Sequence, residues 1–412
     1  MISTFHNRMR QRKANITLLL VAIALLALPF FAAQSAHAQT YTVLHNFRGS
    51  ALDGASPQGQ LLVGSNQDFY GVTALGGTHG YGTVFQMTTA GQETVLHSFA
   101  YFNGYSPTGG LVQDAEGNLY GTTVGGGYGG GYNNGYWGTL FELTGSKETL
   151  LHQFGTGNDA WYPNGVIADA QGNFYGAANS GGVYGYGMIF QFMPHCLGAT
   201  SSCENTLYNF TGGTDGGSPP GGLAWGADGK LYGVTQSGGA TGYGTVFKVD
   251  TSGNLTTLYS FRGPSDGFYP NQGPLAFDTN GNIYGSTLYG GGSTACGSRG
   301  CGTVFRLSTS GVKTIRYAFE GGTSGGFPQA GVVLDAEGNL YGTASQFGDP
   351  TCSCGVLFEV SQSGQKSVLH TWTGSDGANP IAGLLISNGA LYGVASAGGT
   401  SASGVLFELT LK

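Results

Sequence analysis

Charged residues are scarce in this sequence, and basic residues are the scarcest among them. Only 9% of the 412 residues are Asp, Glu, Lys or Arg, with 15 Lys and Arg against 22 Asp and Glu. Residues 1–38 hold four of the 15 basic residues and none of the acidic ones, which leaves the rest of the chain with a formal net charge of −11. Because nucleic-acid phosphates are bound by Lys and Arg, we expect no nucleic-acid partner.

Long apolar runs are also rare, and the longest lies near the start of the chain. Met1–Lys13 is basic, residues 16–31 are mostly apolar, and Ala36-His37-Ala38 offers the small residues that signal peptidase accepts. We predict a signal peptide over residues 1–38, cleaved after Ala38. An uncleaved membrane anchor is the alternative, although the run is short for a span. With no lipobox and no C-terminal anchor seen, the mature chain, residues 39–412, is expected to be secreted or periplasmic and to have no membrane span.

Cysteine is sparse but falls into three local pairs, namely Cys196/Cys203, Cys296/Cys301 and Cys352/Cys354. Disulfides are the expected state of such pairs in an exported protein. Zinc is the alternative, but no His or acidic cluster lies near them in the sequence. The Cys-x-Cys pair is at the long end of bridging range in an extended strand, so whether Cys352 and Cys354 pair with each other stays open.

Glycine and aromatic residues, by contrast, are abundant, with 78 Gly, 24 Phe and 23 Tyr. They form a repeat of about 50 residues marked by the dipeptide Tyr-Gly. The repeated tyrosines are Tyr70, Tyr120, Tyr175, Tyr232, Tyr284, Tyr341 and Tyr392. Each repeat contains four short strands; in the second they are expected at about Gly110–Gln113, Asn118–Thr123, Thr139–Thr144 and Glu148–Phe154. This pattern predicts an all-β fold, a seven-bladed β-propeller of four-stranded blades.

The ends of the mature chain indicate how the ring closes. It starts with an outer-strand phrase, Tyr41–Phe47, and finishes at Gly404–Leu409 without the strand that should follow. We therefore predict that the N-terminal strand joins the last blade, which removes an open sheet edge. Residues 39–412 would then form a single domain.

The repeated phrases resemble the GloVer tandem-repeat family, also described as choice-of-anchor tandem-repeat proteins. The resemblance rests on Gly117-Asn-Leu-Tyr-Gly-Thr-Thr123, on Gly-Thr-Val-Phe at Gly82 and Gly244, and on Gly281-Asn-Ile-Tyr-Gly285. It covers residues 41–410 and implies an exported repeat protein of bacterial type.

Residues that recur in every blade are best explained by the scaffold. His45, His97, His152 and His370 share one blade position with tyrosines, and one histidine per blade is too dispersed for several to meet at one metal. The acids before Gly-Asn, such as Asp114, and those before the recurring proline, such as Asp53, suit turns and caps. We expect no metal, no cofactor and no catalytic residue that the sequence identifies.

The feature that breaks the repeat is aromatic. Within a blade, the loop between strands two and three and the link to the next blade should open on the same face. Aromatic residues gather in these segments, and the candidate ligand-binding residues are Tyr105, Tyr128, Tyr132, Tyr136, Trp137, Trp161, Tyr162, Phe268 and Tyr269. Exposed rings among Gly and Asn suit stacking on sugars or binding a protein. Packing between blades is the alternative role for these rings.

The sequence therefore predicts a monomeric, non-enzymatic binding module for polysaccharide or for a surface protein. Two alternatives remain. One is a propeller enzyme acting on a carbohydrate or lactone, which requires a central pocket with a pair of acids. The other is a structural protein of the cell envelope.

Overall fold

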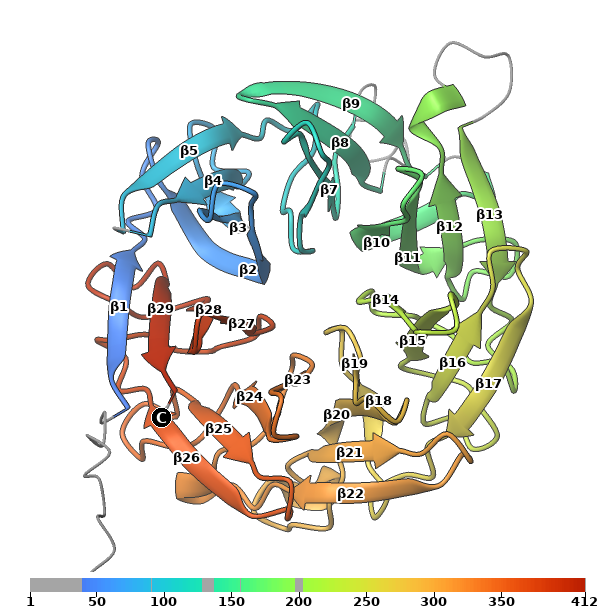
Figure 1. Ribbon diagram of the computed structural model, residues 1–412, viewed down its shortest axis with the longest axis vertical. Helices are drawn as coiled ribbons and strands as arrows, with labels where there is room; N and C mark the ends of the chain where they lie inside the picture. Colours follow the sequence, from blue (N-terminus) through green and yellow to red (C-terminus); the bar gives the residue numbers. More distant parts are fainter. Residues whose placement is uncertain (1–38, 90, 128–136, 156, 197–202, 412) are drawn as a thin grey trace, which may run out of the picture. The chain divides into compact units, whose positions relative to one another are not determined.

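The computed structural model describes residues 39–89, 91–127, 137–155, 157–196 and 203–411. Thr40–Leu411 form one compact unit, in which seven antiparallel sheets stand around a central axis (Figure 1). This is the predicted seven-bladed propeller. The predicted signal peptide lies outside the described residues. Within the described part of the chain, no helix is both long and apolar enough to cross a membrane.

Each blade runs outward from its innermost to its outermost strand. Blade 1 is β2 Gly54–Val63, β3 Phe69–Gly76, β4 Thr83–Met87 and β5 Glu93–Ser98; blade 2 is β6 Val112–Gln113, β7 Leu119–Thr123, β8 Thr139–Thr144 and β9 Lys147–Gln153. Blade 3 is β10 Ala160–Ala168, β11 Phe174–Gly181, β12 Met188–Phe192 and β13 Glu204–Asn209; blade 4 is β14 Ala224–Trp225, β15 Leu231–Thr235, β16 Thr245–Val249 and β17 Leu255–Ser260. Blade 5 is β18 Phe268–Pro270 and β19 Ala276–Phe277, which both pair with β20 Ile283–Tyr289, then β21 Thr303–Leu307 and β22 Lys313–Ala318. Blade 6 is β23 Val333–Leu334, β24 Leu340–Ala344, β25 Val356–Val360 and β26 Lys366–Thr371; blade 7 is β27 Leu385–Ser387, β28 Ala390–Ala395, β29 Val405–Thr410 and β1 Tyr41–Asn46. Three short 3-10 turns complete the described elements, η1 Pro194–Cys196, η2 Gly297–Arg299 and η3 Gly322–Ser324.

The N-terminal strand β1 closes the ring. It pairs antiparallel with β29, with Tyr41 opposite Leu409 and Asn46 opposite Val405. Blade 7 is thus built from both ends of the unit, and the predicted exchange is confirmed. The outer edge of β29 is covered, and no unpaired junction is left between the first and last blades.

Seven buried aromatic pairs hold neighbouring blades together. In each pair, the aromatic residue that follows one blade's outer strand packs on the phenylalanine of Gly-Thr-Val-Phe, or its equivalent, in the next blade. The pairs are Phe47–Phe85, Phe99–Phe141, Phe154–Phe190, Phe210–Phe247, Phe261–Phe305, Phe319–Phe358 and Trp372–Phe407, with ring centroids 4.9–5.4 Å apart. All fourteen rings are inaccessible to solvent. Such pairs contribute about 0.5–1.5 kcal/mol each beyond the burial of apolar area, so the repeat phrases encode the junctions between blades.

The glycine of Tyr-Gly is required by this packing. A Cβ on Gly176 would lie 2.3 Å from Cζ of Phe190, and a Cβ on Gly71 would lie 2.5 Å from Cζ of Phe85. Both distances are far shorter than a van der Waals contact. The second residue of the Tyr-Gly dipeptide is therefore a strand position where only glycine leaves room for the phenylalanine of the neighbouring strand.

The repeated acids serve turns, as predicted. Asp114 accepts hydrogen bonds from the backbone N–H and the side-chain amide of Asn118, both at 2.8 Å, and from the hydroxyl of Tyr120 at 2.9 Å. Burial alone would raise the pKa of Asp114, but these hydrogen bonds lower it. In the linker to blade 1, Asp53 accepts from the N–H groups of Arg48 and Gly54.

Three disulfides form, Cys196–Cys203, Cys296–Cys301 and Cys352–Cys354. The predictions for the first two pairs are confirmed, and the open question about the Cys-x-Cys pair is answered. Cys296–Cys301 and Cys352–Cys354 lie in the loops between the second and third strands of blades 5 and 6. Disulfides persist in oxidising compartments, which is consistent with a secreted or periplasmic protein.

Candidate functional site

One face of the ring is built by the same backbone contact at every junction. The residue before the recurring proline has a left-handed backbone in all seven linkers: Ser56, Ser106, Tyr162, Ser218, Tyr269, Phe327 and Asn379, with φ of 52–60°. In each linker, the N–H group of this residue donates a hydrogen bond to a backbone carbonyl of the preceding blade. The accepting residue is the one directly before the glycine of Gly-Thr-Val-Phe, or of the equivalent phrase. Tyr162, for example, donates to the carbonyl of Trp137 at 2.9 Å. The loops and linkers therefore lie together, as predicted.

The proline after this residue fixes the geometry. A Cβ on Gly138 would lie 2.7 Å from Cδ of Pro163, so the ring of each proline occupies the space that its partner glycine leaves. A residue before proline normally takes an extended conformation. The left-handed conformation costs an L-residue about 1–2 kcal/mol, and for a bulky side chain it is an outlier. At Tyr162, Tyr269 and Phe327 the chain therefore keeps a ring at a strained backbone position.

Two columns of the repeat place aromatic rings on this face. The residue before the glycine is Tyr81, Trp137, Tyr186 and Tyr243 in blades 1 to 4, but Cys301, Cys354 and Ser403 in blades 5 to 7. The residue before the proline is aromatic in the linkers that enter blades 3, 5 and 6. We call the rings of this face the aromatic rim; they are Tyr81, Tyr101, Phe102, Tyr105, Trp137, Trp161, Tyr162, Tyr186, Tyr243, Phe268, Tyr269, Tyr289 and Phe327. The rim spans blades 1 to 6 and is interrupted at the seam between blades 7 and 1.

The rim rings contact one another and still reach solvent. Tyr101 stacks on Tyr105 with centroids 5.6 Å apart, and Trp137 packs against Trp161 at 5.7 Å. In blade 5, Tyr269 lies 6.0 Å from Tyr289. The exposed fraction is 62% for Phe102, 48% for Tyr186, 40% for Tyr269 and 37% for Tyr243. The rings thus support each other sideways while keeping part of their surface open.

The predicted site residues fall into two groups. Tyr105, Trp137, Trp161, Tyr162, Phe268 and Tyr269 all belong to the rim, whereas Tyr128, Tyr132 and Tyr136 lie outside the described residues. The prediction missed Tyr81, Tyr186 and Tyr243. The signal that would have found them is the residue before each Gly-Thr-Val-Phe phrase, because this column changes from aromatic to Cys or Ser along the chain.

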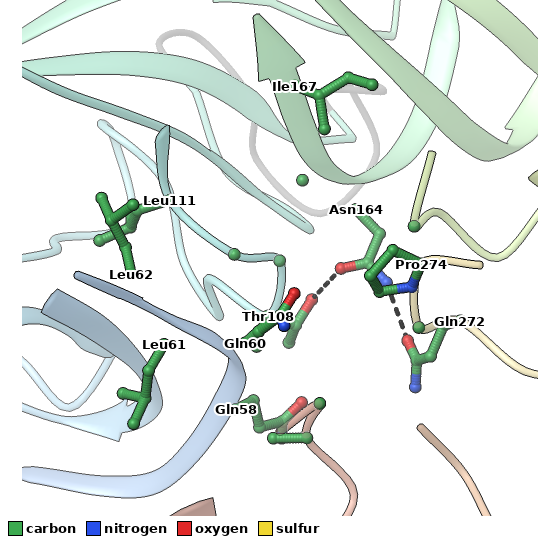
Figure 2. A pocket seen from close by; sticks show the side chains of 18 of the residues that line it. Gln58, Gln60, Leu61, Leu62, Thr108, Leu111, Asn164, Ile167, Gln272 and Pro274 are labelled. Carbon is green, nitrogen blue, oxygen red and sulfur yellow. Dashed lines mark hydrogen bonds between the residues drawn. The ribbon is translucent and has the colours of Figure 1, made fainter. Parts of the chain in front are cut away.

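A central cavity of about 440 Å³ lies among the innermost strands of the blades (Figure 2). Its polar lining residues include Gln58, Thr108 and Asn164, each of which directly follows a recurring proline. Leucines, isoleucine and valines line it further along the same strands. These polar residues therefore lie two positions along the chain from the residue before the proline, which is one of the two columns that carry the rim.

Side-chain amides organise this polar part. Asn164 donates through Nδ2 to the carbonyl of Pro220 and to Oε1 of Gln272, both at 2.8 Å, and accepts from the hydroxyl of Thr108 at 3.2 Å. Figure 2 shows Asn164 between Thr108 and Gln272, to both of which it is hydrogen-bonded. Gln60 donates to the carbonyl of Leu384 at 2.6 Å. Each amide retains hydrogen-bonding capacity beyond these contacts.

No described residue of the cavity lining carries a carboxylate, imidazole, ammonium or guanidinium group, and Tyr175 is the titratable side chain among them. The Gly-x-Ser-x-Gly spacing of hydrolases occurs twice in the described chain, at Gly263–Gly267 and Gly322–Gly326. The first forms a turn between β17 and β18, in which the N–H of Asp266 donates to the carbonyl of Gly263 at 2.9 Å. The second forms the turn η3, and Ser324 donates its hydroxyl to the carbonyl of Gly321 at 2.8 Å. The cavity therefore offers neutral hydrogen-bonding groups, and both serines belong to linker turns and not to a strand-to-helix elbow.

The family described as the Gloeobacter/Verrucomicrobia repeat matches residues 30–136, 128–298 and 291–412. The chain belongs to this family. The match confirms the resemblance drawn from the repeated Tyr-Gly and Gly-Thr-Val-Phe phrases. No curated protein matches the chain.

The chain is similar to several solved structures of low identity. The extracellular domain of a protein described as a hybrid two-component system from B. thetaiotaomicron is 12% identical, with a TM-score of 0.55 over 90% of this chain and 43% of that one. This chain thus spans less than half of that protein. A gluconolactonase from Xanthomonas campestris is 13% identical, with a TM-score of 0.44 over 91% and 90% of the two chains. Regucalcin, a calcium-binding protein from Agrobacterium tumefaciens, is 14% identical, with a TM-score of 0.41 over 73% and 89%.

Proposed function

We propose that this protein is a non-enzymatic, exported module that binds neutral polysaccharide on the face formed by the aromatic rim and the polar part of the central cavity. The observation that carries the proposal is the retention of bulky rings at left-handed positions. Tyr162, Tyr269 and Phe327 adopt φ of 60°, 59° and 58°, where the other four junctions use Ser or Asn. Strain of this kind is held where function requires a side chain at one place.

The chemistry of the face suits sugars. Partly exposed rings present flat apolar surfaces to the C–H faces of a sugar ring, and tyrosine adds a hydroxyl. The amides of Gln58, Asn164 and Gln272 and the hydroxyl of Thr108 can exchange hydrogen bonds with sugar hydroxyls. Because the cavity lining contributes no charge, a neutral glycan suits it better than an acidic one. Export through the predicted signal peptide would place this face where polysaccharides occur.

The test is a binding screen of residues 39–412 against neutral polysaccharides such as cellulose, xylan, β-glucan and mannan. Affinity would be followed by isothermal titration calorimetry. The variants are Tyr162→Asn and Tyr269→Asn, which keep a residue that tolerates the left-handed backbone, and Asn164→Ala in the cavity. We expect binding by the parent and a loss of up to about tenfold in Tyr162→Asn and Tyr269→Asn, since one ring contact is worth about 0.5–1.5 kcal/mol. Asn164→Ala should weaken binding by a similar factor, since one hydrogen bond is worth about 0.5–1.5 kcal/mol.

Ile315→Ala is the matched control. Ile315 is 39% exposed, close to the 40% of Tyr269, but it lies on the outermost strand β22. This variant should bind as the parent does. If no neutral polysaccharide binds, or if the rim variants bind as tightly as the control, the proposal is wrong, and protein ligands become the next hypothesis.

A further inference from the structure

A second set of positions breaks the repeat on the outer side of the ring. The positions are a His or Tyr near the end of one outer strand, the linker residue that caps the next turn, and a residue at or next to the start of the following outer strand. Along the ring from the seam, that third residue is Glu93, Glu148, Glu204, Leu255, Lys313, Lys366 and Tyr41. The charge at this position thus reverses between blades.

At two junctions this position supplies a cation. The ammonium of Lys313 lies 3.0 Å from Oδ1 of Asp266, and its side chain is only 2% exposed. Lys366 donates to the carbonyl of Ser324 at 2.6 Å. The space between the outer strands and the linker therefore accommodates a positive charge next to the linker residue.

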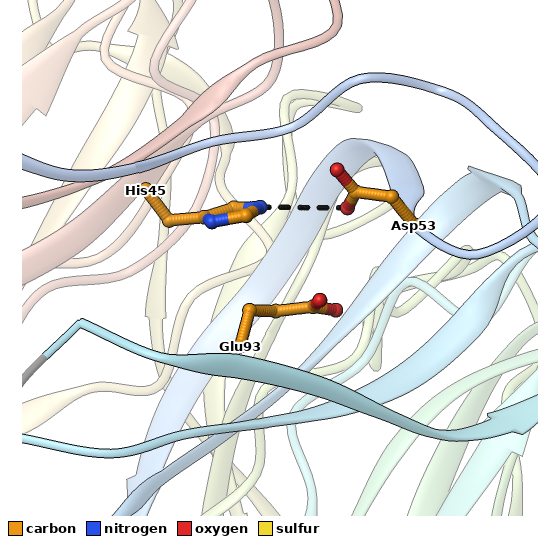
Figure 3. Close-up of side chains that lie close together, drawn as sticks. All are labelled: His45, Asp53 and Glu93. Carbon is orange, nitrogen blue, oxygen red and sulfur yellow. Dashed lines mark hydrogen bonds and ion pairs between the residues drawn. The ribbon is translucent and has the colours of Figure 1, made fainter.

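At two other junctions a glutamate replaces the lysine and leaves the negative groups together. At the seam, Nε2 of His45 lies 3.4 Å from Oδ1 of Asp53, with Glu93 beside them (Figure 3). The same arrangement recurs at His152 and Asp159, 3.3 Å apart, with Glu204. Within each cluster one ligand atom per residue lies within 4.8 Å of the others. The histidines stay apart from one another, as predicted. That each of these two meets acids from a linker and from the next blade was not predicted.

At the seam, the imidazole of His45 faces two acids. Oε1 of Glu93 is buried and has no hydrogen-bond partner in the described part of the chain. Two carboxylates and an imidazole thus occupy the space that holds an ammonium in the junction of Asp266 and Lys313.

We propose that His45, Asp53 and Glu93 bind a divalent transition-metal ion, and that His152, Asp159 and Glu204 bind a second one. One imidazole and two carboxylates form a donor set that Zn²⁺ accepts. Ligands about 2.0–2.2 Å from a tetrahedral zinc lie about 3.4 Å from each other, which is the spacing of His45 and Asp53. The fourth position would be taken by water.

The third glutamate of the column provides an internal contrast. Its linker residue is Asn103, whose amide donates to Oε2 of Glu148 and to Nε2 of His97, both at 3.1 Å. Oε1 of Glu148, like that of Glu93, is buried without a hydrogen-bond partner in the described chain, so the difference lies in the oxygen that Asn103 binds. At this junction the amide of Asn103 links the glutamate to the histidine by hydrogen bonds, whereas at the other two junctions a metal ion would link them. Glu148 is therefore a matched control for the two proposed ligands.

The site at the seam would have a structural role. His45 lies on β1, Asp53 on the linker into blade 1, and Glu93 on β5. A metal bound by all three would tie the strand that closes the ring to the first blade. Because a bound ion stabilises only the folded state, it would raise the melting temperature.

The test uses tag-free residues 39–412, dialysed against EDTA and then titrated with Zn²⁺ alone, with calorimetry and the metal content after gel filtration as readouts. We expect two zinc ions per chain, one in Glu93→Gln and in Glu204→Gln, and two in Glu148→Gln. Zinc should also raise the melting temperature of the parent by several degrees.

Glu93→Lys keeps the test valid if a glutamine variant folds poorly. It recreates the lysine of the junction with Asp266, so it should fold without zinc and bind one ion instead of two. The proposal is overturned if the parent binds no zinc, if Glu93→Lys still binds two ions, or if Ca²⁺ displaces zinc and His45→Asn binds as the parent does.

Discussion

The substitution Tyr269→Asn distinguishes a working aromatic face from rings that only fill space between blades. The backbone at this position has φ of 59°, which costs an L-residue about 1–2 kcal/mol, and asparagine adopts such angles more readily than tyrosine. The ring is 40% exposed and contacts Tyr289 at 6.0 Å. Truncating a fully buried aromatic residue costs about 3–5 kcal/mol, so a partly exposed one should cost about 2 kcal/mol.

The two effects nearly offset each other. We expect Tyr269→Asn to lower the free energy of unfolding by no more than about 1 kcal/mol, because relief of the backbone strain compensates for most of the lost packing. Polysaccharide affinity should nevertheless fall by up to about tenfold. Urea unfolding followed by fluorescence, beside calorimetric titration, measures both quantities on the same preparation.

Ser218→Asn is the control for the backbone, since Ser218 has the same left-handed geometry without a ring. It should change neither stability nor binding. A loss of about 3 kcal/mol or more in Tyr269→Asn would refute the reasoning, because it would mean that the ring belongs to the core. Unchanged affinity in a stable variant would equally exclude Tyr269 from the binding face.

Three further predictions concern the scaffold and the cavity. Gly176→Ala should lower the free energy of unfolding by about 1–3 kcal/mol in thermal unfolding, because its Cβ would meet Phe190 at 2.3 Å. Gly110→Ala, whose Cβ would have its nearest atom at 3.4 Å, should cost less than about 1 kcal/mol. Equal losses in the two variants would contradict the packing argument. Asn164→Ala should cost about 1–3 kcal/mol, because the carbonyl of Pro220 and the amide of Gln272 lose their donor; a neutral effect in urea unfolding would show that water replaces it. Burial lowers the pKa of His97 from 6.5 to about 4, so the folded state resists protonation, and the stability present above pH 6.5 is lost as the pH falls toward 4. Allowing for solvent screening of a half-buried ring, His97→Gln should remove about 1–2 kcal/mol of this acid-dependent loss. The measurement compares unfolding curves of the parent and the variant at pH 7.5 and 4.5. If the two proteins lose the same free energy of unfolding between these pH values, His97 is not responsible.

The fold could be predicted because the same local rule is repeated seven times. Phe154 and Phe190 show why: each repeat contains the ring and the glycine that makes room for the next ring, so one junction predicts all the others. Ring closure by β1 followed from the same rule, since Tyr41–Phe47 is an outer-strand phrase that lacks its own blade. Repetition supplied the evidence that a single copy of these short strands would not have given.

The site could be predicted only in part, because it depends on positions that differ between repeats. Tyr162 and Tyr269 were identified from their composition alone. Their left-handed backbone was not foreseen, since a residue before proline normally adopts an extended conformation. The meeting of His45 with Glu93 was not foreseen either, because the register between the outer strands of adjacent blades is set by three-dimensional packing and not by distance along the chain.

The rim and the proposed metal clusters coincide at the junction of blades 2 and 3, which holds Trp137 and Tyr162 as well as His152, Asp159 and Glu204, but they differ at the seam. At the seam, the two columns that carry the rim hold Ser56 and Ser403, whereas the outer column holds the complete cluster of His45, Asp53 and Glu93. An ion bound there would join β1 to blade 1, and through the pairing of β1 with β29 it would hold blade 7 against blade 1. The seam is therefore a junction with a proposed structural ion and without a ring in either rim column. Removal of zinc with EDTA should accordingly lower the melting temperature of the parent more than that of Glu93→Lys, which carries its own cation at that position.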